Sequence, residues 1–129
     1  RIRAQGGVIT VPHPVDRVRR SSAIGQAALE HIVEQVDAIE ILNARCSFAA
    51  DNLLAASLAA KHHKLCTAGS DAHAAYEIGG AYVDLDPFDG PQSFLASLRG
   101  ARIGGRRSPV WMRFSSAYAK LARKLGRAR

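Results

Sequence analysis

Residues 65–73 read LCTAGSDAH, an apolar run that ends in a turn and is followed by Asp71 and His73. The run, residues 65–68, has the length and composition of a buried strand. In extended backbone, side chains two positions apart point to the same side, so the Asp71 carboxylate and the His73 imidazole can converge on one ion. Carboxylate with imidazole suits zinc, manganese or iron. The alternative for Asp71 is a helix cap in an ordinary turn, and the strand before it favours the metal ligand.

Two similar runs precede this stretch, and helical patterns separate them. Residues 8–11 and 38–42 are apolar and rich in β-branched side chains, which predicts two further buried strands. The spacing of apolar residues predicts helices over about residues 21–36 and 53–63. Strand, helix, strand, helix, strand with short connections indicates right-handed crossovers and a parallel sheet, so we expect an α/β fold.

Chemistry in parallel sheets gathers at the carboxyl ends of the strands, and polar residues follow all of the strands predicted here. His13 stands between Pro12 and Pro14 after the first strand, where the two prolines fix its backbone. Taken alone, His13 would be a loop histidine without a role. Because Asp71 and His73 follow another strand at the same edge of the sheet, we expect His13 to be the third metal ligand.

The middle strand carries Glu40 inside it and is followed by Asn43 and Arg45. A carboxylate inside an apolar strand needs a partner or an ion. We interpret Glu40 and Asn43 as residues that hold the metal ligands in place, and Arg45 as a contact to substrate phosphate. A structural ion pair, or a hydrogen bond that ties the loops together, is the alternative for Asn43 and Arg45.

Three arginines follow the Pro-His-Pro sequence, and a helix N-terminus beside arginine is a natural phosphate site. We expect Arg17, four residues after His13, to bind phosphate. A solvated basic loop explains Arg19 and Arg20 equally well. The chain has no G-x-S-x-G, P-loop or G-x-G-x-x-G sequence, which excludes the common serine hydrolase, NTPase and dinucleotide-binding classes.

The net charge of +7 is concentrated in the C-terminal region. Residues 1–98 hold 8 Lys and Arg against 11 Asp and Glu, whereas residues 99–129 hold 10 Lys and Arg and no acidic residue. The stretch GGRRSP, residues 104–109, has the composition of a linker. We therefore expect a body over residues 1–107 and a basic helical tail over residues 108–129.

The basic tail has two interpretations. It can pack its apolar stripe on the body, or it can bind RNA, DNA or an anionic membrane surface. The basic residues proposed for binding are Arg106, Arg107, Arg113, Lys120, Arg123 and Lys124. Cys46 and Cys66 are too few for a disulfide framework and indicate reduced thiols in a cytoplasmic protein. Every apolar run is shorter than the roughly 20 residues of a membrane span.

Residues 6–107 resemble the PHP (polymerase and histidinol phosphatase) family and its associated C-terminal segment. The resemblance rests on GGVITVPHPVDRVRR, AIEILNAR and NLLAASLAAKHHKLCTAGSDAHAAYEIGGAYV, in this order. It implies the C-terminal part of a metal-dependent phosphoesterase with a distorted (β/α)7 TIM-like barrel. Two or three metal ions would lie at the carboxyl ends of its strands, and the substrate would be a phosphorylated small molecule or a nucleic acid. The metal ligands of the family match His13, Asp71 and His73, and Glu40 matches a recurrent position without a ligand role.

The chain departs from the family pattern at its start. The family opens with an H-x-H motif and further His and acidic ligands, and this sequence contains no such motif. We therefore expect a fragment that is nearly inactive alone and needs the N-terminal half of the same barrel. The alternatives are a binding module that acts through the basic tail, or a non-catalytic half-barrel that covers its open sheet edge with a partner or as a homo-oligomer.

Overall fold

The computed structural model describes residues 1–109. Its elements in chain order are a 3-10 turn (Arg3–Gln5), β1 (Thr10–Val11), α1 (Gln26–Ile32), a 3-10 turn (Val33–Gln35), β2 (Ala38–Asn43), α2 (Ala49–Lys61), β3 (Leu65–Gly69), a 3-10 turn (Ala75–Glu77), β4 (Ala81–Asp84), α3 (Pro91–Gly100) and β5 (Arg102–Gly105). The helix expected in the basic tail lies outside the described residues.

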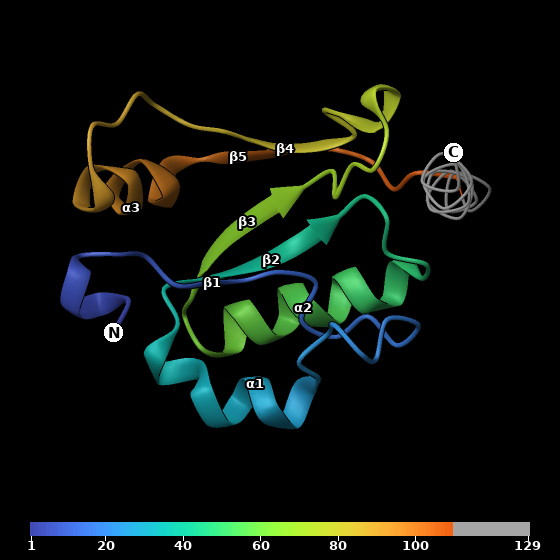
Figure 1. Ribbon diagram of the computed structural model, residues 1–129, viewed down its shortest axis with the longest axis horizontal. Helices are drawn as coiled ribbons and strands as arrows, with labels where there is room; N and C mark the ends of the chain where they lie inside the picture. The colour runs from blue at the N-terminus through green and yellow to red at the C-terminus, as the bar shows by residue number, and fades with distance from the viewer. Residues whose placement is uncertain (110–129) are drawn as a thin grey trace, which may run out of the picture.

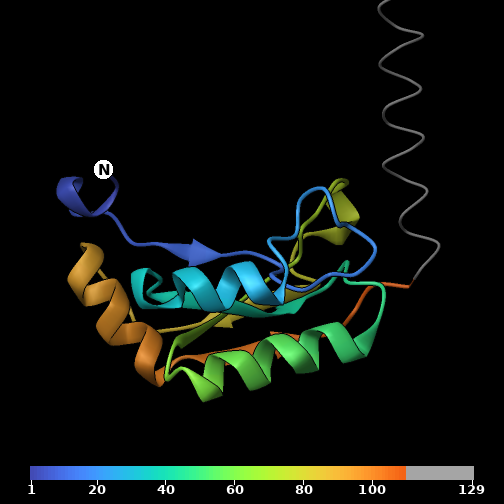
Figure 2. The same ribbon diagram turned by 90° about the horizontal axis from the view of Figure 1, so that it is seen from below.

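The first three strands form a parallel sheet in the order β1-β2-β3. Helices α1 and α2 connect successive strands and lie together on one side of this sheet (Figures 1 and 2). The predicted α/β class with parallel strands is therefore confirmed. Within the described part of the chain the strands form one three-stranded and one two-stranded sheet, and no closed barrel.

The apolar core lies between β2 and the two helices. Ile39, in the middle of the sheet, is completely buried, and so is Leu29 of α1. The core residues are Val11, Leu29, Val33, Val36, Ile39, Leu58 and Ala59. Branched side chains on the strands meet the apolar positions of the helices here, and this contact fixes the layer arrangement.

Both helices begin at positions that differ from the sequence prediction. Helix α1 starts at Gln26 rather than near residue 21, because Gly25 has a φ of 82° and its N–H donates to Pro14 O over 2.8 Å. Positive φ does not fit a right-handed helix, so the helix cannot extend further toward the N-terminus. Helix α2 starts at Ala49 instead of residue 53, which places Asp51 in its first turn.

The remaining elements form a hairpin-like unit beside β3. Strands β4 and β5 pair antiparallel, with α3 between them in sequence, and the pair lies next to β3 in Figure 1. The prediction that a linker begins at Gly104 is wrong, because Gly104 pairs with Tyr82. A Cβ at Gly104 would lie 2.5 Å from the Tyr82 ring. The glycine therefore leaves room for this ring against β5.

Two further properties follow from the described residues. No helix among residues 1–109 is long and apolar enough to cross a membrane. Cys46 and Cys66 are both free thiols.

Candidate metal site

Two of the three predicted ligands have unusual backbone conformations. His13 follows β1 with a φ of 29°, and Asp71 follows β3 with a φ of 51°. The third described non-glycine residue with positive φ is His63, which follows α2. Strained backbone of this kind is maintained only where the surrounding structure determines it, and it is concentrated at functional sites. Both conformations lie at the carboxyl edge of the parallel sheet.

Glu40 joins the ends of the neighbouring strands. Its Oε2 accepts a hydrogen bond of 2.6 Å from the backbone N–H of His13 and one of 3.0 Å from Asn43 Nδ2. A bulge in β2 lies directly after Glu40, between residues 40 and 42. A Cβ on Gly69 of β3 would lie 2.7 Å from Glu40 Oε1, so the space for this carboxylate depends on a glycine there. Burial raises the pKa of Glu40, although the hydrogen bonds from Asn43 and His13 act against the rise.

Asn43 is the centre of the polar network. The residue is 1% exposed, and both polar atoms of its side chain are used. Nδ2 donates to Glu40 Oε2 and, over 3.3 Å, to Asp71 Oδ2. Oδ1 accepts 3.0 Å hydrogen bonds from Arg19 Nη2 and from the backbone N–H of Arg45. One buried amide therefore fixes a carboxylate, a guanidinium and the loop after β2.

Asp71 is held ionised by Arg19. Oδ2 of Asp71 accepts hydrogen bonds from Arg19 Nη1 and from Asn43 Nδ2. Burial opposes ionisation of Asp71, but the hydrogen bond and charge of Arg19, with the Asn43 contact, outweigh it and lower its pKa. An ionised carboxylate at the edge of a parallel sheet is the state that a metal ligand needs.

His73 is oriented by two contacts. Its Nδ1 lies 2.7 Å from Asp71 O, and since a carbonyl can only accept, Nδ1 carries the proton. In the neutral ring, the lone pair is then on the other nitrogen, Nε2. A backbone carbonyl that accepts from one imidazole nitrogen is the usual support of a metal-binding histidine. The His73 backbone N–H donates to Glu77 Oε2 over 2.5 Å.

His13 provides the test of whether these residues suit a metal. Its Nδ1 is buried and has no hydrogen-bond partner within the described residues. A buried imidazole nitrogen without a partner is unfavourable unless it receives a ligand. The backbone N–H of His13 donates to Glu40 Oε2, so His13 lies at the same strand end as this carboxylate. Imidazole and carboxylate are the right donor types for a divalent ion. Within the described residues, however, the structure does not bring donor atoms of His13, Asp71 and His73 all within 4.8 Å of one another.

The two arginines predicted to bind phosphate occupy different environments. Arg45 is 7% exposed and its Nη1 donates to both oxygens of the buried Glu77, at 3.1 and 2.8 Å. For Arg45 the sequence allowed either a phosphate contact or a structural ion pair, and the structure shows the ion pair. Arg17 has a side chain that is 53% exposed; it donates from Nε to Asp51 Oδ1 over 2.6 Å and lies over the Phe48 ring.

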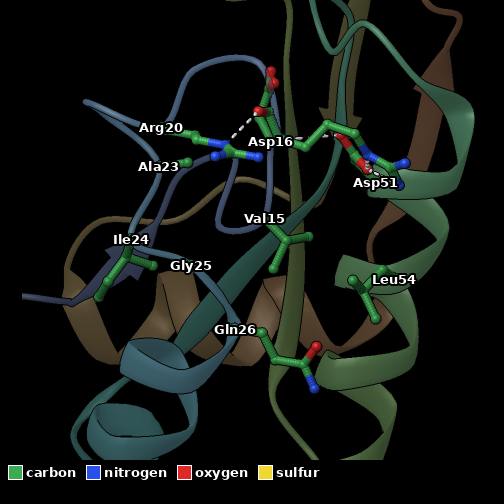
Figure 3. Close-up of a pocket in the computed structure, with 10 residues that line it drawn as sticks. Val15, Asp16, Arg20, Ala23, Ile24, Gly25, Gln26, Asp51 and Leu54 are labelled. Carbon is green, nitrogen blue, oxygen red and sulfur yellow. Dashed lines mark hydrogen bonds and ion pairs between the residues drawn. The ribbon is translucent and has the colours of Figure 1, made fainter.

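A cavity of about 400 Å³ opens beside Arg17. Figure 3 shows Arg20, Ile24 and Gly25 of the β1–α1 loop on one side of it and Leu54 of α2 on the other. Asp16 also lines the cavity, whereas none of the three predicted ligands does. The cavity therefore adjoins the polar network through Asp16 and does not contain the candidate metal site.

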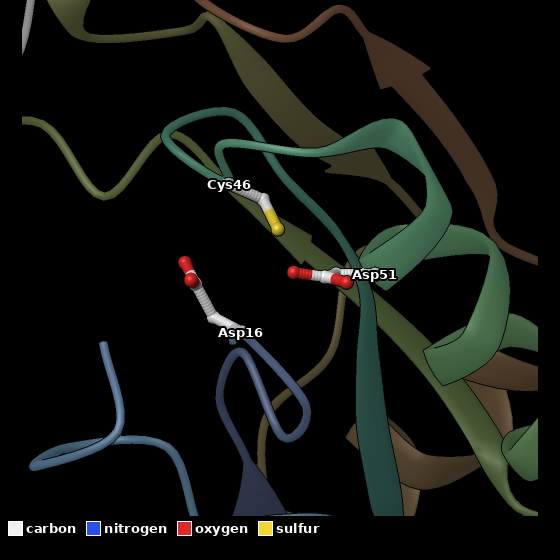
Figure 4. A group of neighbouring side chains, drawn as sticks. All are labelled: Asp16, Cys46 and Asp51. Carbon is white, nitrogen blue, oxygen red and sulfur yellow. The ribbon is translucent and has the colours of Figure 1, made fainter. Parts of the chain in front are cut away.

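A second group of possible metal donors lies nearby. Donor atoms of Asp16, Cys46 and Asp51 come within 4.8 Å of one another (Figure 4). Each carboxylate already has an arginine partner, Arg19 for Asp16 and Arg17 for Asp51. Burial and the two carboxylates raise the pKa of the Cys46 thiol to about 11, which disfavours the thiolate that metal binding requires. The contacts give this group a structural explanation, as the anchor of the β1–α1 loop.

Of the basic residues assigned to the tail, two are described. Arg107 donates from Nη1 to Ser47 O over 2.7 Å, which ties the segment after β5 to the loop after β2. Arg106 lines a cavity of about 480 Å³ with Tyr76 and Ser108. The others, Arg113, Lys120, Arg123 and Lys124, lie outside the described residues.

Sequence reasoning missed four residues of the network. For Arg19 the sequence left a phosphate site and a solvated loop equally open, and Asp16, Asp51 and Glu77 received no role at the site. The spacing of Asp16 and Arg19 by three residues was the one local sign of their ion pair. Glu77 comes four residues after His73 and gave no signal, because its partner Arg45 is distant in sequence.

Comparison with known proteins agrees with the resemblance drawn from the motifs. Residues 49–103 match a family model described as PHP-associated, which supports a PHP-family C-terminal portion in this chain. An uncharacterized protein of Methanocaldococcus jannaschii is 34% identical over 108 residues, which cover 77% of this chain and 46% of that protein. The chain thus spans about half the length of this relative. No solved structure matches the chain.

Proposed function

We propose that the chain is the C-terminal part of a metal-dependent phosphoesterase in which His13, Asp71 and His73 hold divalent metal. The observation that carries the proposal is the buried Nδ1 of His13, which has no hydrogen-bond partner within residues 1–109. The tautomer of His73, fixed by Asp71 O, supports it. Zinc, manganese or iron fits this mixture of imidazole and carboxylate.

The residues around the ligands have separate tasks in this proposal. A bound divalent ion would supply an activated water and offset charge on the phosphate. Glu40 holds the backbone of His13 at the strand end, and Asn43 orients Glu40 and Asp71 together. Arg45 acts on His73 through Glu77, whose carboxylate binds both. Arg45 thus orients the proposed ligand His73, and other arginines contact the substrate.

Arg17 remains our proposal for binding the anionic end of the substrate. Half of its side chain is exposed, and the cavity beside it also contains Arg20. Two guanidinium groups beside an open cavity suit a phosphorylated small molecule or a nucleic-acid end. The basic residues beyond Pro109 would extend such a surface, which remains a prediction.

We also propose a specific fold within the α/β class: a TIM-like barrel of which this chain forms the C-terminal part. The supporting observation is that β1 is an edge of the parallel sheet within the described residues, with β2 as its partner strand. A parallel edge of this kind is normally covered. The N-terminal half of the same barrel would cover this edge. It would also add metal ligands, so that the complete site holds two or three ions. Alternatively, a second copy of the chain covers the edge.

Metal titration of the 129-residue chain tests the proposal. Cobalt(II) serves as a probe because its visible absorption reports nitrogen and oxygen ligands directly. We expect saturable binding that Asp71→Asn and His73→Ala each weaken by about tenfold or more. His31→Ala, on the exposed part of α1, is the matched control and leaves binding unchanged. Equal affinity of the His73 and His31 variants would refute the site.

Activity is tested in a protein that contains the H-x-H segment before this region. With manganese present, we expect hydrolysis of a simple aryl phosphate that Asp71→Asn abolishes. The isolated chain should show almost none. Full activity of the Asp71 variant would contradict the phosphoesterase proposal.

A further inference from the structure

Arg19 binds three partners at the edge of the sheet. Its Nε donates to Asp16 Oδ2 over 2.8 Å, its Nη2 to Asn43 Oδ1 over 3.0 Å, and its Nη1 to Asp71 Oδ2. The side chain is 23% exposed, so much of this contact is shielded from water.

The contact places a fixed positive charge on one oxygen of Asp71. Oδ2 accepts from Arg19 and from Asn43, which uses both lone pairs of a carboxylate oxygen. Oδ1 instead faces His73, whose Nδ1 lies 3.9 Å away. A metal ion can approach Oδ1, but it can use Oδ2 only by displacing a donor. It must also accept the guanidinium as a close neighbour of like charge.

Asp16 keeps Arg19 in this place. The Asp16 side chain is completely buried, and its Oδ1 accepts from the backbone N–H groups of Val18 and Arg19, at 2.9 and 3.2 Å. The loop is therefore folded around the carboxylate that binds the guanidinium. Arg19 is therefore positioned by its own loop as well as by Asn43 and Asp71.

We propose that Arg19 is a built-in competitor of the metal ion at Asp71, and that the Arg19–Asp71 ion pair sets how tightly this chain binds metal. The inference rests on the proposed function, because it assumes that Asp71 is a ligand. Arg19 is a positioning residue in this scheme and acts on the metal through Asp71. The site then holds metal more weakly than its ligands alone would allow.

The experiment is a cobalt(II) titration of the 129-residue chain and its variants, without substrate. We expect Arg19→Gln to tighten binding by about tenfold or more, the order of a charge-assisted hydrogen bond that no longer competes for the same carboxylate. Arg20→Gln is the matched control, since it removes the same charge from the same loop. Its Nε contacts Arg17 O and not a predicted ligand, so we expect no change.

The effect must depend on Asp71. In a chain that already carries Asp71→Asn, adding Arg19→Gln should leave affinity unchanged, because the competed carboxylate is gone. Equal tightening by the Arg19 and Arg20 variants would show a general charge effect and overturn the inference. So would an unchanged affinity in Arg19→Gln.

Failure of this inference differs from failure of the proposed function. If Asp71→Asn weakens metal binding but Arg19→Gln leaves it unchanged, only the proposed competition between Arg19 and the metal is overturned. Absence of saturable binding in both wild type and Arg19→Gln overturns the metal site itself. If Arg19→Gln does not fold, as circular dichroism would show, Arg19→Lys replaces it. A lysine lacks the planar guanidinium fork with which Arg19 reaches Asp16, Asn43 and Asp71 at once. A smaller tightening is therefore expected, and no tightening again overturns the inference.

Discussion

Strand β2 has two faces that differ in chemistry, although consecutive residues provide them. Ile39 is completely buried in the core with α1 and α2. Glu40, the next residue, is 9% exposed and binds the His13 backbone and Asn43. Successive side chains on a strand point to opposite faces, so one strand serves both the core and the candidate site.

The comparison separates what stabilises the fold from what shapes the site. The face toward the helices consists of apolar contacts, whose contribution comes from the area removed from water. The other face contains buried carboxylates, an amide and a guanidinium, which contribute only while each has its partner. Substitutions on the apolar face should change stability alone. Substitutions on the polar face should change both stability and metal binding, by amounts that differ from one variant to another.

The largest expected effect comes from Ile39→Ala. Removing this side chain from the core should lower the free energy of unfolding by about 2–5 kcal/mol. Cobalt binding per folded molecule should stay as in the wild type. Urea unfolding measures the first quantity, and Ile78→Ala is the control, because Ile78 is 75% exposed and its truncation should change stability by less than about 0.5 kcal/mol. Equal losses in both variants would refute the assignment of the core.

Glu40→Ala should have the next largest effect. It leaves the His13 N–H and the Asn43 amide without their acceptor, and an unsatisfied buried group costs about 1–3 kcal/mol. Because the His13 backbone loses its anchor, metal affinity should fall as well, in contrast to Ile39→Ala. Urea unfolding and cobalt titration of the same preparation measure both. A loss of stability with unchanged affinity would separate Glu40 from the site.

The sequence predicted the parts of this arrangement that depend on local patterns. Apolar runs and helical spacing gave three parallel strands with two crossover helices, and the strand ends placed His13, Asn43 and Asp71 at one edge. Which side Glu40 faces was not decided, because alternation along a strand does not reveal which face meets the helices. The network around Arg19 depends on a loop folded around Asp16, and no periodic pattern encodes it.

The errors have physical causes of the same kind. Gly104 was assigned to a linker because the stretch GGRRSP, residues 104–109, has the composition of one. In the fold, the absence of a side chain at Gly104 makes room for the Tyr82 ring, a requirement that comes from a partner 22 positions earlier. The ion pair of Arg45 with Glu77 likewise joins residues 32 positions apart. Long-range pairing of this sort cannot be derived from composition or spacing.

A smaller effect is expected from Gly69→Ala. The new Cβ would lie 2.7 Å from Glu40 Oε1, and the carboxylate can move only by weakening its hydrogen bonds. We expect a loss of about 1 kcal/mol, the lower end of the range for overpacking, together with weaker cobalt binding. Gly100→Ala is the matched control, since a Cβ there meets nothing within 4 Å. Identical unfolding curves for the two variants would contradict the role given to Gly69.

The smallest effect is a difference in the free energy of unfolding between Glu40→Gln and the wild type. This difference should change with pH. Burial raises the pKa of Glu40 above its ordinary value of 4.5, so the folded chain keeps this proton to a higher pH than the unfolded chain. The stability from this group is complete below 4.5 and is lost as pH rises through the folded value. Glutamine does not titrate, so Glu40→Gln should gain stability relative to the wild type as pH rises from 4.5 to neutrality.

Asp16 gives the opposite sign within the same network and serves as the internal control. Burial opposes its ionisation, but hydrogen bonds from Arg19 and Val18 outweigh burial and place its pKa below the ordinary 3.8. Its contribution is therefore present above 3.8 and disappears as pH falls through the folded value. Urea unfolding of Glu40→Gln, Asp16→Asn and the wild type, from pH values below 3.8 up to neutrality, should give two stability differences that change in separate pH windows. A Glu40→Gln difference that stays constant above 4.5 would mean that the carboxylate is not desolvated, and that the polar face of β2 is open to water.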